Sequence, residues 1–94
     1  MSQKRVHVVV RGHVQGVGFR ANCARRAEAL GVTGWVRNQW DGSVEALFEG
    51  EVAAVDRLVD WCRAGPSRSD VTSVVVADAE DAPLQRSFSI RGSY

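Results

Sequence analysis

The sequence has no large excess of either charge: twelve lysine and arginine residues stand against eleven aspartate and glutamate residues, which gives a net charge of +1. Because the positive and negative charges nearly cancel, the protein has no overall basic field that would attract nucleic acid. Any anion-binding site must therefore be local. No apolar run is long enough to span a bilayer, and the run at residues 6–10 is too short for a signal peptide. We therefore expect a soluble, cytoplasmic protein with no membrane partner.

Cysteine is scarce, and no C-x-x-C pair is present. Cys23 and Cys62 lie far apart in the sequence, which is not the spacing of a metal site. Both fall on expected helices, so we interpret them as small buried hydrophobic residues. A disulfide between them is the alternative, if the two helices pack side by side.

Several motifs of nucleotide and metal enzymes are missing. The chain contains no G-x-x-x-x-G-K-[ST], no G-x-G-x-x-G and no H-E-x-x-H. His7 and His13 have no partners at metal-ligand spacing, so we interpret them as surface residues. Ser43 lies beside an expected turn and has no apparent base. We therefore expect neither a metal nor a cofactor.

The length of 94 residues predicts one domain, residues 1–94, and a monomer is the default for this size. Hydrophobic residues make up 45% and charged residues 24%, as in ordinary globular proteins. Period-two and helical spacings of apolar residues predict the elements. These are strands at 6–10, 35–39, 43–49, 71–77 and 88–91, a helix over 19–30 closed by Gly31, and a helix whose apolar stripe is Val52, Val55, Leu58, Val59 and Cys62.

The second and third strands are expected to form a hairpin with the three-residue loop Trp40-Asp41-Gly42. This loop pairs Asn38 with Val44 and Gln39 with Ser43, and it places Gly42 in a left-handed conformation. A two-residue loop would turn the apolar residues of the second strand away from those of the third, because a one-residue slip flips a whole strand.

The resulting βαββαβ order, with a short extra C-terminal strand, predicts an α+β fold: a ferredoxin-like sandwich with two helices on one face of an antiparallel sheet. Right-handed crossovers place the third strand between the first and second. The first two strands then run parallel and end at the same edge. There the segment that leaves the first strand would meet Asn38.

That segment is rich in glycine and lies between a strand and a helix. Three glycines in seven residues let the chain turn tightly and expose its N–H groups, at the positive end of the following helix. Arg20 adds a cation to that end, and the interaction of this cation with the positive end of the helix dipole is unfavourable. A bound phosphate would offset both positive charges. The candidate phosphate-binding residues are Gly12, His13, Val14, Gln15, Gly16, Val17 and Gly18.

Phosphoryl transfer requires mainly positioning and electrostatic stabilisation. Backbone N–H groups and Arg20 could hold the phosphoryl oxygens, and Asn38 could orient a water. A carboxylate leaving group needs no general acid, whereas an alcohol would need one and none is evident. Each feature also has an ordinary structural interpretation: the glycines turn the chain, Arg20 is a solvated residue, Asn38 flanks a turn, and Trp35 and Trp40 are packing or rim aromatics.

The chain resembles the acylphosphatase family. Gly12-x-Val14-Gln15-Gly16-Val17-x-Phe19-Arg20 is similar to its first signature, and Gly34-Trp35-Val36-Arg37-Asn38 with Asp41-Gly42-x-Val44-Glu45 is similar to its second. Phe48-Glu49-Gly50 and Phe88-x-Ile90 also look like family positions, so the resemblance covers essentially the whole chain.

This resemblance implies hydrolysis of acyl phosphates to carboxylate and inorganic phosphate without a metal. It implies that Arg20 binds the phosphate, that the amides of Gly12–Gly18 surround it, and that Asn38 orients the attacking water. Two alternatives stay open. One is a non-catalytic anion- or RNA-binding module, although the third strand lacks the RNA-recognition pattern. The other is a role in carbamoyl phosphate chemistry, as in larger maturation enzymes that contain such a segment.

Overall fold

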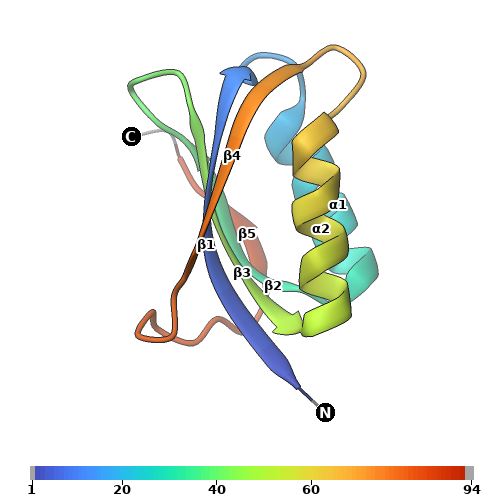
Figure 1. Cartoon of the computed structure of the whole chain (residues 1–94), viewed down its shortest axis with the longest axis vertical. Helices are drawn as coiled ribbons and strands as arrows, with labels where there is room; N and C mark the ends of the chain where they lie inside the picture. The colour runs from blue at the N-terminus through green and yellow to red at the C-terminus, as the bar shows by residue number, and fades with distance from the viewer. Residues whose placement is uncertain (1, 93–94) are drawn as a thin grey trace.

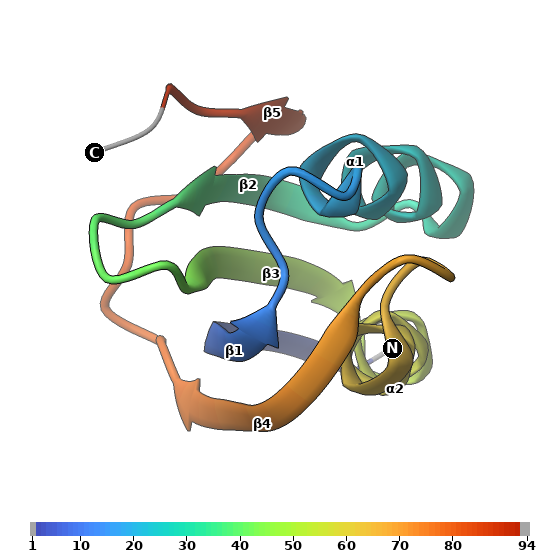
Figure 2. The same ribbon diagram turned by 90° about the horizontal axis from the view of Figure 1, so that it is seen from above.

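The fold follows the expected βαββαβ order with a short strand at its end. The computed structural model describes residues 2–92. Its elements are β1 (Gln3–His13), α1 (Phe19–Leu30), β2 (Thr33–Asn38), β3 (Val44–Glu51), α2 (Val52–Ala64), β4 (Asp70–Asp78) and β5 (Phe88–Ile90). One five-stranded sheet of order β4-β1-β3-β2-β5 carries both helices on a single face (Figures 1 and 2). The ferredoxin-like sandwich and the central place of β3 between β1 and β2 are thereby confirmed.

The sheet is mixed rather than purely antiparallel. β1 pairs antiparallel with β3 and β4, and β2 pairs antiparallel with β3, as expected. β5, however, lies parallel to β2, with Gly34 opposite Phe88 and Val36 opposite Ile90. The reason is the connection over residues 79–87, which crosses from one edge of the sheet to the other and reverses the chain (Figure 1).

The core lies between the sheet and the helices and is built from the predicted stripes. Alternate residues of β1 and β3 point toward the helices because side chains of a strand alternate between its faces. The buried set includes Val6, Val8, Val10, Val44, Ala46, Phe48, Cys23, Ala27, Val55, Leu58, Val59 and Cys62. Val52 is the exception to the predicted stripe. As the first residue of α2, it is 36% exposed.

The two cysteines are buried free thiols, as the interpretation as small hydrophobic residues predicts. A hydrogen bond with Cys62 and burial together raise the pKa of the Cys23 thiol well above its ordinary value. A thiol held neutral in this way is a poor nucleophile, so Cys23 contributes packing rather than chemistry.

The β2–β3 hairpin has the predicted register. Asn38 pairs with Val44, the Gln39 N–H donates to the Ser43 carbonyl over 2.9 Å, and Gly42 has a φ of 90°. β2 begins two residues earlier than predicted, at Thr33, because Gly34 interrupts the apolar pattern without interrupting the strand. Gly34 has a φ of 136°, and a Cβ there would overlap the carbonyl oxygen of Leu47.

We expect Gly34→Ala to destabilise the protein more than Gly31→Ala. Both glycines have positive φ, which costs an L-residue roughly 1–2 kcal/mol. A Cβ at Gly31 meets open space, whereas one at Gly34 displaces the backbone of β3, so we expect an additional loss of about 2 kcal/mol. Urea unfolding of both variants measures the difference. Equal losses would contradict the close approach of β2 and β3.

Candidate active site

The glycine-rich segment is a loop only over its last five residues. Gly12 and His13 belong to β1, where they pair with Val71 and Asp70 beyond a bulge between Arg11 and Gly12. The expectation of a loop from Gly12 was therefore wrong for its first two residues. The reason is that β4 begins early enough to pair with β1 beyond the bulge. Figure 2 shows the remaining chain crossing from the end of β1 to the start of α1.

The remaining residues, Val14–Gly18, form a loop outside the sheet, which we call the free loop. Two of its residues are buried in the core and two are exposed to solvent. Val14 and Val17 are buried against the core, while Gly16 and Gly18 are exposed and have φ values of 75° and 80°. Gly18 is the N-cap of α1; no side-chain hydrogen bond caps the helix, and no acidic residue lies in its first turn. The N–H groups at this end therefore have no anionic side chain of their own.

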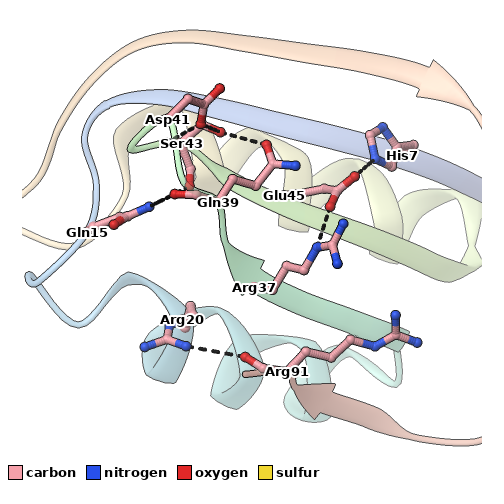
Figure 3. Close-up of polar contacts among 9 residues, drawn as sticks. All are labelled: His7, Gln15, Arg20, Arg37, Gln39, Asp41, Ser43, Glu45 and Arg91. Atoms are coloured by element: carbon pink, nitrogen blue, oxygen red, sulfur yellow. Dashed lines mark hydrogen bonds and ion pairs between the residues drawn. The ribbon is translucent and has the colours of Figure 1, made fainter. Parts of the chain in front are cut away.

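Arg20 lies in the first turn of α1 and is partly exposed. Its Nη1 donates to the carbonyl oxygen of Arg91 over 3.3 Å (Figure 3). The N–H of Arg91 in turn donates to the Val36 carbonyl over 2.9 Å, which fixes the chain after β5 to β2. The main chain directly after β5 thus orients the Arg20 guanidinium. Sequence reasoning missed this contact, since a main-chain acceptor 71 residues away leaves no side-chain signal.

Asn38 is the last residue of β2 and is partly buried. Together with Arg37, Gln39, Trp40 and Asp41 it lines a surface hollow at the end of the hairpin. Trp40 is 81% exposed, as expected of a rim aromatic. Arg91 is hydrogen-bonded to Val36 of β2, and Asn38 lies two residues further along the same strand. The contacts through Arg91 therefore link Arg20 to the strand that ends at Asn38.

The loop also touches the hairpin directly. The Nε2 of Gln15 donates to the carbonyl oxygens of Gln39 and Ser43, over 2.8 and 2.9 Å (Figure 3). The sequence singled out Gln15 only for its backbone N–H, so its side chain is a second feature that sequence reasoning missed. The contact places the loop beside the residue that follows Asn38, as the strand order predicts.

The turn of the hairpin is held by its own side chains. Ser43 is buried; its N–H donates to Asp41 Oδ1 over 2.9 Å, and its Oγ lies 2.6 Å from the same oxygen. The side-chain and main-chain hydrogen bonds from Ser43 hold the pKa of Asp41 below its ordinary value, against the small opposing effect of burial. The Ser43 hydroxyl thus serves the turn.

A second polar cluster lies on the sheet face opposite the helices. His7 Nε2 lies 2.6 Å from Glu45 Oε2, and Arg37 Nε donates to Glu45 Oε1 over 2.5 Å (Figure 3). Burial raises the pKa of Glu45, but the hydrogen bonds and charges of His7 and Arg37 together outweigh it, so the pKa is lowered. Arg37 precedes Asn38, and its side chain points to the other face of the sheet.

Comparisons with known proteins identify the family. A sequence model of the acylphosphatase family matches residues 6–90. The chain belongs to the acylphosphatase family. An acylphosphatase of Rubrobacter xylanophilus is 53% identical over 88 residues, which cover 94% of this chain and 80% of that protein. The resemblance seen in the two signatures is thereby confirmed.

Solved structures agree. The acylphosphatase of Bacillus subtilis has a TM-score of 0.89 at 34% identity, with 96% of this chain and 99% of that chain covered. A full-length HypF, solved in a phosphate- and nucleotide-bound form, also has a TM-score of 0.89, at 26% identity, but this chain spans only 12% of its length. Family membership supports acyl phosphate hydrolysis as the activity of this chain.

Within residues 2–92, no three or more histidine, cysteine, aspartate or glutamate side chains gather as a metal site would require. Neither helix in that range is long and apolar enough to cross a membrane.

We expect Glu45→Gln to destabilise the protein at neutral pH, by an amount that shrinks in acid. Because the pKa of Glu45 is lowered in the folded state, its carboxylate adds stability above an unfolded pKa of about 4.3, and this is lost as the pH falls through the folded pKa. Urea unfolding at pH 7, 5, 4 and 3 measures the difference between the variant and the parent. The exposed Glu28→Gln serves as control. A difference that stays constant over this range would contradict the stabilising ion pairs.

Proposed function

We propose that this chain hydrolyses the carboxyl–phosphate bond of acyl phosphates by in-line attack of a water, without a metal. In this proposal Arg20 and the N–H groups of Gly12–Gly18 hold the phosphate, chiefly those of the free loop Val14–Gly18, and Asn38 orients the water. The observation that supports it most is the oriented guanidinium of Arg20 beside a helix start that has no anionic cap.

The phosphate site acts through charge and geometry. The transferring phosphoryl group spreads negative charge over its equatorial oxygens, and donors fixed in place before the reaction stabilise this charge. The guanidinium supplies a planar pair of donors that fits two oxygens of one phosphate. Main-chain N–H groups of the loop and of the first turn of α1 supply the rest.

The amide of Asn38 has both a donor and an acceptor, so it can hold a water in a fixed orientation. The water oxygen forms a bond to phosphorus while the bond from phosphorus to the carboxylate oxygen breaks. The leaving oxygen takes the bonding electron pair and departs as a stable carboxylate, so no general acid is required. The proton of the water passes to an oxygen of the phosphate itself, and no side-chain base is needed.

The function is tested by phosphate release from an acyl phosphate in buffer that contains EDTA, with a phosphate monoester as control. We expect release from the acyl phosphate alone, because only its leaving group departs without an acid. Carbamoyl phosphate belongs in the same assay, because the sequence resemblance left carbamoyl phosphate chemistry open as an alternative. Hydrolysis of the monoester at a similar rate would contradict the mechanism.

Arg20→Ala should abolish turnover and phosphate binding together. A cationic group on a transferring phosphoryl group can be worth roughly 10³–10⁵ in rate. Arg20→Lys should fail as well, since a point charge cannot replace the planar pair of donors. Arg57→Ala removes the same charge from the exposed side of α2 and controls for net charge. Near-normal kcat/KM in Arg20→Lys would argue against a two-point contact.

Asn38→Ala should lose turnover and keep its affinity for inorganic phosphate, because the amide is assigned to the water and not to the phosphate. Steady-state kinetics measure the first effect, and calorimetric titration of phosphate into the folded variant measures the second. A parallel loss of phosphate affinity would place Asn38 in the phosphate site instead.

A further inference from the structure

The side chain of Gln15 makes a contact that the proposed reaction leaves unused. Its Nε2 carries two protons, and the carbonyl oxygens of Gln39 and Ser43 are placed to accept one each, over 2.8 and 2.9 Å. Both bonds are partly buried, so water competes weakly for them. A side chain from the loop thus bridges the two residues that close the hairpin turn.

The two carbonyl acceptors lie at the end of the hairpin, next to Asn38. Gln39 directly follows Asn38, and the Gln39 N–H donates to the Ser43 carbonyl, the bond that closes the hairpin. Asn38 itself is paired with Val44 across the same ladder. The Gln15 amide, which Figure 3 shows beside Gln39 and Ser43, therefore constrains from the loop side the main chain that follows Asn38.

We propose that Gln15 is a positioning residue, which sets the separation between the phosphate-binding loop and Asn38. This inference rests on the proposed function. In-line attack requires the water, phosphorus and leaving oxygen to be aligned, and a displacement of about 1 Å can cost about 10²-fold in rate. The side chain of Gln15 acts on this alignment through the hairpin and touches neither water nor phosphate, whereas its main-chain N–H belongs to the phosphate-binding loop.

A second side-chain link to the same hairpin turn, made from β1 rather than from the loop, provides a control. Arg11 of β1 lies 3.7 Å from a carboxylate oxygen of Asp41 in the hairpin turn, and both side chains are about half exposed. An exposed ion pair of this length holds little and is screened by salt. Arg11→Gln should therefore leave kcat within about twofold of the parent, a size of effect expected for such pairs.

Two substitutions separate the positioning role from folding. Gln15→Glu keeps the shape but turns an oxygen toward two carbonyl oxygens, which pushes the loop away. Gln15→Ala removes the bridge and leaves both carbonyls with another donor, since Ser43 O accepts from the Gln39 N–H and Gln39 O from the Gly42 N–H. The alanine variant is therefore expected to fold even where the glutamate variant does not.

We expect kcat to fall about tenfold in Gln15→Ala and about a hundredfold in Gln15→Glu, the range that misalignment produces. The affinity for inorganic phosphate should stay within about threefold of the parent, because the loop keeps its anchors Val14 and Val17 and changes only its distance from Asn38. Acyl phosphate kinetics and phosphate titration provide the two values. Parent-like kcat in Gln15→Ala, or a loss of phosphate affinity parallel to that of kcat, would overturn the inference.

A double-variant cycle completes the test. With Asn38→Ala in place there is no amide left to align, so Gln15→Ala should cause no further fall in kcat. A full tenfold further fall would overturn the positioning role. If Asn38→Ala alone keeps parent turnover, the proposed role of Asn38 fails, and this inference fails with it. If Asn38→Ala is inactive while Gln15→Ala is fully active, only the positioning role fails.

Discussion

The candidate site depends on the position of β3 between β1 and β2. β3 pairs antiparallel with both neighbours, so β1 and β2 run in the same direction and end at the same edge of the sheet. The loop leaves the end of β1, and Asn38 is the end of β2. Residues that are far apart in sequence, such as Gln15 and Gln39, thus meet without a long connection, and the hairpin register decides which side chain β2 presents there.

The start of α1 combines two features that are unfavourable without a ligand. An arginine lies at the positive end of a helix dipole, and no acidic side chain offsets it. Three contacts of Arg91 hold this arrangement in place. The Arg91 carbonyl accepts a hydrogen bond from Arg20, and the Arg91 N–H donates to β2. The Arg91 guanidinium lies 4.5 Å from the centre of the Trp35 ring. The short strand β5 therefore matters for the candidate site, because it places Arg91, which directly follows it, in contact with both Arg20 and β2.

Local patterns predicted the elements well because the apolar spacing of each strand and helix is visible in the sequence. The bounds of α1, the closing Gly31 and the pairing of Asn38 with Val44 came directly from spacing and side-chain parity. The start of the loop, the parallel β5 and the contacts of Gln15 and Arg20 could not be predicted. Each depends on a main-chain partner that only the assembled sheet brings close. Because every residue has a carbonyl oxygen, the sequence does not indicate which of them will accept a hydrogen bond.

On the open face of the sheet, the ring of Trp35 is flanked by two cations. Stacking of bases requires an aromatic ring with an accessible face. The Trp35 ring already has the guanidiniums of Arg37 and Arg91 beside it, at 5.4 and 4.5 Å from its centre. Arg37 is further engaged by Glu45, and Arg5 of β1 by Glu49. These carboxylates pair with two of the cations on which a phosphate backbone could draw, and the two ion pairs link β3 to both of its neighbours, β1 and β2.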